Sequence, residues 1–480
     1  MDTQVIVVGA GPTGLMLASE LDLAGVRVTV MERLAARTGQ SKALNLQPRT
    51  AEVLDLRGWF EPISSRAVTN LPAGHFAGLP LDYQALDTRF PYQVGIPQAR
   101  VAEFLEDRLL DRGVPVLRDR ELVGLRQDTD GVTAIVRSVD GHQSVRADYL
   151  VGADGGRSAV RTLAGIDFPG RDGRVSLVVA DVVLTGEHLP TGWQLPTFDP
   201  DADRGPFLLP LGDGVFRLLF GGPAQQGLDR DAPVTEAEIT AALRPGTRLH
   251  EVRWASRFTD ASRQARRYRD GRVLLAGDAA HIHIPAGGQG LNLGMQDAFN
   301  LGWKLAAQVR GWAPAGLLDT YHDERHPVGA RVLANTRAQG VLASPDPDVR
   351  ALRGILADLL REPAANRQIA GMISGLDIRY DMPCAPRHPL LGTALSDITL
   401  HSGRGALVEF GQRSGLGAAL CGWSDRVEHL VEPARQDAGA VLVRPDGYVC
   451  WAGSSDDELR SALGRWFGKA TGEIASRSNS

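Results

Sequence analysis

Apolar residues at the start of the chain are grouped in short continuous runs separated by a segment with helical periodicity. Residues 4–8 form a β-branched run with the length of a fully buried parallel strand. A helical pattern follows over 15–24, Gly25 ends it, and residues 26–32 predict a second strand. This order predicts a complete βαβ unit within about 30 residues.

Further along the chain, the pattern departs from this alternation. Amphipathic helices are predicted over 49–57 and 101–112, and the segment between them, 71–92, is rich in Gly, Pro and aromatic residues. Such a composition favours an excursion into another layer over a further βα repeat. Strands with a hairpin turn at Asp140-Gly141 are then expected over 121–125, 132–136 and 149–151.

Between about residues 168 and 268 the pattern is typical of a mostly antiparallel sheet. Asp213-Gly214 between two apolar runs is a type I′ hairpin signal. Strands are expected over 175–184, 192–198, 207–210, 215–220 and 250–258. The chain then returns to a buried strand over 272–276 and a helix over 295–309. Two βαβ-like stretches far apart in sequence are therefore expected to complete one sheet.

The last third of the chain is predicted to be helical and then to form a small α/β module. Helical patterns extend over 317–342 and 349–373. In the module we expect strands over 406–410, 439–443 and 448–451, a turn at 445–447, a helix over 457–467 and a frayed end at 476–480. A length of 480 residues fits about three domains.

Composition narrows the class of partner. The chain has 52 Lys and Arg against 57 Asp and Glu, and the net charge of −5 disfavours nucleic acid or an anionic membrane as the main partner. No apolar run approaches the roughly 20 residues that span a bilayer, and Asp2 stands where a signal peptide would be basic. We therefore expect a soluble, cytoplasmic protein.

Neither a disulfide framework nor a metal site is indicated. The cysteines, Cys384, Cys421 and Cys450, have no Cys-x-x-Cys spacing and no histidine cluster beside them. His281 and His283 lie two residues apart, and no carboxylate partner is expected beside them. This disfavours a metal and leaves His281 a structural or flavin-adjacent role.

The first candidate binding motif is Gly9-x-Gly11-x-x-Gly14, which follows the first predicted strand and opens the first helix. Gly9 allows a tight turn, Gly11 lets the backbone approach a pyrophosphate, and Gly14 permits close packing of helix on strand. Glu32 ends the second strand 18 residues after Gly14, in reach of an adenosine ribose. Together these features predict a bound adenine dinucleotide, either FAD or NAD. They disfavour the alternative of a glycine-rich turn that binds no ligand.

A second motif, Gly277-Asp278, again follows a buried strand and precedes the glycine-rich loop 285–292 at a helix start. We expect Asp278 to hydrogen-bond a ribityl hydroxyl and the amides of Leu291 and Asn292 to face the pyrimidine end of a flavin.

A third turn, residues 152–158, carries Asp154 and Arg157. Three such turns on one sheet favour a long, extended dinucleotide. Alternatively, Asp154 caps a helix and Arg157 forms a surface ion pair.

In this order and spacing, the three motifs resemble those of the class A (single-component) flavoprotein aromatic hydroxylases. Within that class the chain is most similar to the bacterial aromatic polyketide hydroxylases and rifampicin monooxygenase. Supporting stretches are 9–21, 49–55, 96–98, 149–161 and 275–305. The resemblance covers essentially the whole chain and is specific to the subfamily, though not to a substrate.

The resemblance implies an α/β fold, with a Rossmann-like FAD domain, an inserted mostly antiparallel sheet domain for the substrate, and a C-terminal thioredoxin-like domain. The FAD domain would comprise 1–70, 98–167 and 270–340, the substrate domain 71–97 and 168–269, a helical connection 341–389, and the thioredoxin-like domain 390–475. Because that last domain lacks Cys-x-x-Cys, thiol redox activity is not expected.

The implied activity is FAD-dependent monooxygenation of a polycyclic aromatic, polyketide-like substrate in antibiotic or secondary-metabolite biosynthesis, by a monomer or homodimer. NADPH or NADH would reduce the flavin, and a flavin C4a-hydroperoxide formed from dioxygen would hydroxylate the ring. Two alternatives stay open: Baeyer–Villiger type or antibiotic-inactivating oxygenation by the same fold, and a flavin-binding pathway protein without turnover.

Site residues follow from the same resemblance. Gln98 would contact the ribityl or pyrophosphate region, the Leu122 backbone the adenine, and Pro285 would lie beside the flavin ring. The implied cofactor-binding set is Gly9, Gly11, Thr13, Gly14, Glu32, Arg33, Lys42, Gln98, Leu122, Asp154, Asp278, Pro285, Gly290, Leu291 and Asn292. Candidate substrate residues are Phe76, Trp193, Phe198, Phe207 and Phe220. No side chain is assigned a catalytic role, because the flavin would perform the chemistry.

One residue departs from the family pattern. Lys42, in Ser41-Lys42-Ala43, stands where the family usually has Arg. Lys keeps the charge but loses the planar fork of donors. We therefore expect flavin positioning or nicotinamide preference to differ from that of relatives.

Overall fold

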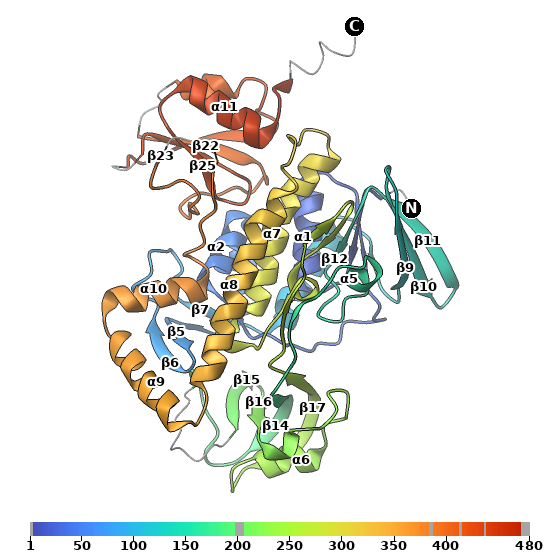
Figure 1. Ribbon diagram of the computed structural model, residues 1–480, viewed down its shortest axis with the longest axis vertical. Coiled ribbons are helices and arrows are strands. Elements are labelled where there is room, and N and C mark those ends of the chain that lie inside the picture. The colour runs from blue at the N-terminus through green and yellow to red at the C-terminus, as the bar shows by residue number, and fades with distance from the viewer. Residues whose placement is uncertain (1–2, 197–205, 384–386, 412–414, 436–437, 472–480) are drawn as a thin grey trace.

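A six-stranded sheet lies at the middle of the computed structural model, which describes residues 3–196, 206–383, 387–411, 415–435 and 438–471 (Figure 1). Its strand order is β19-β20-β12-β1-β2-β8, and every neighbouring pair is parallel except β19–β20. The strands are β1 (Val5–Val8), β2 (Val28–Met31), β8 (Val116–Leu117), β12 (Tyr149–Gly152), β19 (Arg269–Asp270) and β20 (Val273–Leu275). The first βαβ unit and the late return of the chain to the same sheet are both confirmed.

Two helices pack closely against each other beside this sheet, α1 (Pro12–Leu23) and α7 (Gly290–Val309). A Cβ at Gly302 of α7 would lie 2.5 Å from the Glu20 side chain of α1, so this contact depends on glycine. Helix α7 begins at Gly290, five residues before the predicted start at Met295, because the glycine-rich loop leads directly into the helix. The other helices of this region are α2 (Pro48–Leu56), α3 (Phe60–Ser64), α4 (Gln98–Asp111), α5 (Ala159–Leu163) and α8 (Thr320–Leu342).

A four-stranded antiparallel sheet forms one end of the molecule (Figure 1). Its order is β15-β16-β14-β17, with β14 (Ser176–Thr185), β15 (Phe207–Gly212), β16 (Val215–Gly221), β17 (Arg248–Thr259) and the nearby helix α6 (Glu236–Ala242). The predicted type I′ hairpin is confirmed by positive φ at Asp213 (52°) and Gly214 (72°).

The strand predicted over 192–198 is wrong where the structure describes it. Residues 192–196 form no strand, and residues 197 and 198 lie outside the described part of the chain. Pro190 and Pro196 have no amide hydrogen to donate to a ladder, and Gly192 weakens strand formation.

Smaller sheets connect these layers. Strands β9 (Glu121–Gln127), β10 (Val132–Ser138) and β11 (Gly141–Ala147) form a meander, and β11 was not predicted because its residues are mostly polar and exposed. The remaining strands are β3 (Asn45–Leu46), β4 (Thr69–Leu71), β5 (Ala73–Phe76), β6 (Leu79–Asp82), β7 (Gln93–Gly95), β13 (Gly170–Arg171), β18 (Ser262–Gln264) and β21 (His281–Ile282). Of these, β7 pairs with both β3 and β4.

The helical pattern predicted over 349–373 is confirmed, but two helices occupy it. These are α9 (Pro347–Leu359) and α10 (Pro363–Ser374). Glu362 precedes Pro363 and is extended, as the residue before a proline usually is, so the helix is interrupted there. None of the helices that the structure describes is both long and apolar enough to cross a membrane.

A small α/β module forms the end opposite the antiparallel sheet (Figure 1). Its sheet order is β23-β22-β24-β25, and only β22–β23 is parallel. The elements are β22 (Gly405–Phe410), β23 (Val427–Glu432), β24 (Ala440–Val443), β25 (Val449–Gly453) and α11 (Asp456–Phe467). Strand β23 was not predicted, since it interleaves charged residues with its apolar ones.

Candidate functional site

Two of the three glycines of the first motif, Gly9 and Gly14, have the structural roles that their spacing predicts. Gly9 has a φ of 108°, and a Cβ there would lie 2.4 Å from the Ala153 carbonyl oxygen. A Cβ at Gly14 would lie 2.0 Å from the Gly9 carbonyl oxygen. A Cβ at Gly11 would meet no described atom within 4 Å. Gly9 and Gly14 are therefore needed by the fold, whereas Gly11 leaves open space before the first turn of α1.

Glu32 lies beside this turn, at the end of β2. Its carboxylate accepts hydrogen bonds from the amides of Ala10 (2.9 Å) and Leu34 (3.0 Å). Its carbonyl accepts the Arg120 amide (2.9 Å), which brings the start of β9 and the buried Leu122 close to the same edge of the sheet. The neighbouring Arg33 side chain is exposed.

Thr13 joins the first motif to the second. A Cβ at Gly277 would lie 2.8 Å from the Thr13 hydroxyl oxygen, and a Cβ at Gly294 of α7 would lie 2.5 Å from it. The turn at Gly277, the start of α1 and the start of α7 therefore meet at one point. Asp278 is exposed on this turn.

The loop before α7 presents main-chain donors. The Asn292 side chain accepts the Gln47 amide (2.7 Å) and donates to the carbonyls of Asn45 (3.2 Å) and Gly288 (2.8 Å), so it holds the loop in place. The amides of Gly290, Leu291 and Asn292 belong to the first turn of the helix, where amides have no acceptor within the helix. Pro285 is exposed at the head of the loop.

Both helix starts are suited to polar or anionic groups. Among the described side chains none caps the start of α1 or of α7, and neither first turn contains an acidic residue. Free amides and the positive dipole end of a helix bind phosphate and carbonyl oxygens. With open space at Gly11 and a carboxylate at Glu32, these residues fit a dinucleotide such as FAD.

The segment that carries Lys42 is held on both sides while the Lys42 side chain is exposed. Gln98 accepts the Ala43 amide through its side chain (3.2 Å), and the Ser41 hydroxyl accepts the Ala99 amide (3.0 Å). The backbone of this segment is thus tied to the start of α4.

Arg217 reaches the same segment from the antiparallel sheet. Its guanidinium donates to the Ser41 carbonyl, pairs with Asp181 (Nε to Oδ1, 2.5 Å) and lies over the Trp254 ring (5.5 Å to the centroid). Arg217 and Asp181 were missed by sequence reasoning. A charged residue within each of two apolar strand patterns, 215–220 and 175–184, was the available signal.

The two faces of this sheet separate the predicted aromatic residues. Phe207 pairs with Leu219, whose side chain lies on the Arg217 face, toward the Ser41 segment. Phe220 lies with Phe216 in the apolar cluster on the other face, against Ile239 of α6. Phe207 therefore lies on the face turned toward the Ser41 segment, and Phe220 does not.

The other predicted substrate residues are dispersed. Trp193 donates its indole N–H to the Pro210 carbonyl (2.8 Å), and its ring lies where a Cβ at Gly95 of β7 would be 2.8 Å away. Phe76 is buried in the cluster between the β5–β6 hairpin and α10. Phe198 lies outside the described residues.

Asp154 and Arg157 show the contacts of the simpler alternative. The Asp154 carboxylate accepts the Ser158 hydroxyl (2.5 Å) and the Ala159 amide (2.7 Å) at the start of α5. Burial raises the pKa of Asp154, against these hydrogen bonds, which lower it. Arg157 pairs with Asp231 at the surface.

His281 has a carboxylate partner that was not expected from the sequence. Its Nε2 lies 2.6 Å from Asp297 Oδ2, and both residues are buried. Asp297 lies on α7, 16 residues further along, so local sequence could not show the pair. Burial acts to raise the pKa of Asp297, but the adjacent Arg325 and His281 outweigh it and hold that pKa below its ordinary value.

Comparison with known families and proteins agrees with this geometry. The family described as FAD binding domain matches residues 2–336, and the family described as aromatic-ring hydroxylase, C-terminal, matches residues 385–470. The 12-dehydrotetracycline 5-monooxygenase/anhydrotetracycline 6-monooxygenase of Streptomyces rimosus is 46% identical, over 98% of this chain and 99% of that protein. A rifampicin monooxygenase of Streptomyces venezuelae is 47% identical, over 97% of this chain and 99% of that protein.

One relative is named a synthase instead of a monooxygenase. It is the dialkyldecalin synthase of Streptomyces rugosporus, which is 39% identical over 98% of this chain and 100% of that protein. Among solved structures, the OxyS anhydrotetracycline hydroxylase from Streptomyces rimosus superposes with a TM-score of 0.87, at 46% identity and with 97% of this chain and 99% of that chain covered. The expected resemblance is confirmed: the chain belongs to the FAD-dependent aromatic-ring hydroxylases, flavoprotein monooxygenases that include the anhydrotetracycline and rifampicin monooxygenases.

Proposed function

We propose that this protein is an FAD- and NAD(P)H-dependent monooxygenase that hydroxylates a polycyclic aromatic, polyketide-like substrate in antibiotic or secondary-metabolite biosynthesis. The observation that carries the proposal is the meeting of two uncapped helix starts, those of α1 and α7, at the Gly277–Asp278 turn. This arrangement offers amides to both the pyrophosphate and the flavin ends of one extended cofactor.

The residues that would hold FAD follow from these positions. The amides after Gly11 would bind the pyrophosphate, and the Glu32 carboxylate would accept hydrogen bonds from the adenosine ribose hydroxyls. Asp278 accepts hydrogen bonds from ribitol, and the Leu291 and Asn292 amides donate to the pyrimidine carbonyls. When bound, FAD supplies the redox chemistry, taking a hydride from NADPH or NADH and activating dioxygen at its C4a position.

The remaining predicted contacts complete this set. Gln98 is assigned to the ribityl or pyrophosphate region, the Leu122 backbone to the adenine, and Pro285 and Gly290 to the flavin ring. Thr13 supports the meeting point of the two helix starts. Cofactor contact by Asp154, Arg33 and Lys42 rests on the family resemblance, since Asp154 already accepts hydrogen bonds within α5.

The substrate is assigned to the space between the central sheet and the antiparallel sheet. On that side lie Phe207, Arg217 and Trp193, which supply apolar rings and one cation. A phenolic polyketide combines flat apolar rings with acidic hydroxyls, and this pairing of residue types suits both.

The domain assignment of the proposal follows the same division. Residues 1–70, 98–167 and 270–340 hold FAD, residues 71–97 and 168–269 hold the substrate, and 341–389 lead to a thioredoxin-like domain over 390–475. The FAD segment 1–70 and the substrate segment 71–97 are in contact, because β7 of the second pairs with β3 of the first and with β4 at the boundary.

The test is rapid-mixing reduction of the purified protein. The protein should show the absorbance band of bound oxidised flavin near about 450 nm. Under anaerobic conditions NADPH or NADH should bleach this band, and a true aromatic substrate should accelerate the bleaching; anhydrotetracycline and rifampicin are the first probes. A protein that takes up no FAD, or whose flavin no nicotinamide reduces, contradicts the proposal.

A second candidate function is favoured by one relative. A protein 39% identical to this chain is named dialkyldecalin synthase, so the names of the relatives are not confined to monooxygenases. In this alternative the chain binds flavin and acts on a pathway intermediate without consuming NAD(P)H or dioxygen. Product formation under anaerobic conditions without nicotinamide identifies that case.

The similarity to rifampicin monooxygenase supports antibiotic inactivation as a variant of the main proposal. In that variant, or in a Baeyer–Villiger oxygenation, the same oxygen atom enters a carbon–carbon bond or leads to cleavage of the substrate. NMR of the purified product separates a new phenol from a lactone or an opened ring.

A further inference from the structure

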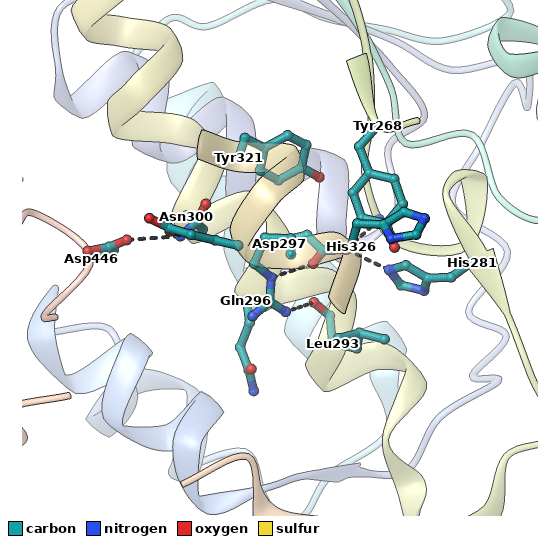
Figure 2. A network of polar contacts seen from close by, with 12 residues as sticks. Tyr268, His281, Leu293, Gln296, Asp297, Asn300, Tyr321, His326 and Asp446 are labelled. Atoms are coloured by element: carbon teal, nitrogen blue, oxygen red, sulfur yellow. Dashed lines mark hydrogen bonds and ion pairs between the residues drawn. The ribbon is translucent and has the colours of Figure 1, made fainter. Parts of the chain in front are cut away.

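The C-terminal module is joined to α7 and α8 by a buried polar turn, Arg444 to Gly447. Arg444 donates to both carboxylate oxygens of Glu324 on α8 (2.6 and 2.8 Å) and to Asp446 (3.0 Å from its Nε). Asp446 also accepts from the side-chain amide of Asn300 on α7 (3.1 Å), as Figure 2 shows. Arg444, Asp446 and Asn300 are each at most 2% exposed.

The α7 and α8 side of this joint is equally enclosed. The Asn300 side chain donates to Glu324 (2.7 Å), and the buried Lys304 ammonium donates to Glu324 (2.8 Å) and to Oδ1 of the Asn300 side chain (2.9 Å). Every one of these groups has an oppositely charged or hydrogen-bonded partner in the cluster. The module turn therefore fixes the Glu324 side chain and with it one turn of α8.

The residue after Glu324 points toward the candidate flavin site. Arg325 donates to the Asp297 carboxylate (2.7 Å), to the Leu293 carbonyl (3.2 Å) and to the Tyr380 hydroxyl (2.9 Å). The Tyr380 ring packs on Tyr448 of the module, with centroids 4.3 Å apart. Arg325 is thus held between the module and the N-terminal half of α7.

Asp297 completes the connection. Its Oδ2 accepts the amide of Gly277 (3.2 Å) and lies 2.6 Å from His281 Nε2 (Figure 2). Gly277 has a φ of 62° and directly precedes Asp278, so the orientation of this carboxylate sets the orientation of the turn that carries Asp278. Asp297 is fully buried, and no other described side chain accepts the Gly277 amide.

We propose that the Arg444–Asp446 turn of the C-terminal module is a positioning element of the flavin site, acting through Glu324 and Arg325 on Asp297 and the Gly277–Asp278 turn. This rests on the proposed function, because it takes Asp278 to contact FAD. The module would then set the geometry of the cofactor site, in addition to any role as a separate domain.

A purely stabilising joint would be expected to look different. Replacing a buried ion-pair network by apolar residues of similar size is often neutral or stabilising, so such a network is weak evidence for stability alone. What it does provide is one defined arrangement of its members, because each charge must keep its partners. A defined arrangement is what a cofactor-binding turn requires.

The experiment is a double-mutant cycle on FAD affinity in the full chain. Asp297→Asn and Asp446→Asn are made singly and together, and the Kd for FAD is measured by flavin fluorescence well below the unfolding temperature. Tyr380→Phe is a milder variant of the same connection, since it removes only the hydroxyl that accepts from Arg325. Leu463→Ala is the matched control, because Leu463 is buried in the apolar core of the module and has no polar atom that takes part in the network.

We expect Asp297→Asn to raise the Kd by about tenfold, because asparagine has one acceptor oxygen in place of two and so leaves either Arg325 or the Gly277 amide with His281 without an acceptor. Asp446→Asn and Tyr380→Phe should each raise it by about threefold, and the double variant should fall short of the product of the two single effects by about threefold. Each should also shift the absorbance spectrum of bound flavin. Leu463→Ala should lower the unfolding temperature with unchanged Kd and spectrum.

The proposal is overturned if Asp446→Asn and Tyr380→Phe leave the Kd and the spectrum unchanged, if the effects of Asp297→Asn and Asp446→Asn simply multiply, or if Leu463→Ala weakens FAD as much as they do. Where Asp446→Asn does not fold, Tyr380→Phe decides by the same criterion. A wild-type protein that binds no FAD would instead refute the proposed function, so the two failures are distinguishable.

Discussion

Replacing Gly11 by alanine separates the requirements of the fold from those of the cofactor. Gly11 has φ −78° and ψ 170°, which alanine adopts without strain, and its Cβ would meet no described atom within 4 Å. The variant should be within about 0.5 kcal/mol of wild type, since the reduced freedom of the unfolded chain offsets the lower preference for alanine at the N-cap of α1. The protein without FAD should fold normally.

Binding of FAD to this variant should be much weaker. The added methyl projects into the space where the pyrophosphate approaches the start of α1, and loss of one or two amide-to-phosphate hydrogen bonds removes about 3 kcal/mol. That corresponds to a rise in Kd of about 100-fold. The assays are thermal unfolding followed by circular dichroism, and FAD titration followed by fluorescence.

The matched control is Gly14→Ala, whose Cβ would lie 2.0 Å from the Gly9 carbonyl oxygen. It should lower the unfolding temperature of the protein without FAD, which Gly11→Ala should not. The reasoning is refuted if Gly11→Ala folds normally and binds FAD within about threefold of wild type, since a pyrophosphate could not then lie at this turn.

Three further predictions concern other parts of the site. Lys42→Arg should change the ratio of NADPH to NADH efficiency or the rate of flavin reduction by about threefold or more with unchanged stability, because the exposed fork gains bidentate contacts; equal kinetics would remove any role for Lys42. Arg217→Met should slow substrate-stimulated flavin reduction by about tenfold, and it leaves Asp181 without its ion-pair partner. The check is to measure kcat and KM for this variant and for Asp181→Asn. Burial acts to raise the pKa of Glu324, but Arg444 and Lys304 outweigh it and lower that pKa from 4.5 to about 2. The ionised Glu324 therefore contributes about 3 kcal/mol to the free energy of unfolding above pH 4.5, and this contribution is lost as the pH falls toward 2. Acid unfolding of Glu324→Gln should therefore take up about one proton fewer than that of wild type in this pH range. An equal dependence of the unfolding free energy on pH in the two proteins would contradict the pairing of Glu324.

Local sequence patterns predicted those parts of the fold that neighbouring residues determine. The β1–α1–β2 unit, the hairpin at Asp213-Gly214 and the terminal helix α11 follow from periodicity and turn chemistry within short windows. At two places where the predicted elements differ from the structure, prolines within the same short windows interrupt the apolar pattern. The prolines around 192–196 prevented a strand, and Pro363 divides the predicted helical stretch 349–373 into two helices.

The candidate site was predictable where the backbone defines it and not where distant side chains do. The glycines, Asp278 and Asn292 belong to contiguous motifs, and their positions were expected from spacing. Asp297 with Gly277, Arg217 with Ser41 and Asp446 with Asn300 are contacts between elements that lie far apart in the chain. No local window contains both members of such a pair, so only the folded structure brings them together.

The central claim is that this protein transfers one atom of dioxygen to an aromatic substrate while its bound FAD is reoxidised. Turnover under ¹⁸O₂ with NADPH and the substrate that most accelerates flavin reduction tests it directly, with mass spectrometry and NMR of the product. The account predicts one ¹⁸O atom in a new hydroxyl group on the ring. A product that carries no ¹⁸O, or that forms equally without dioxygen and nicotinamide, would contradict it.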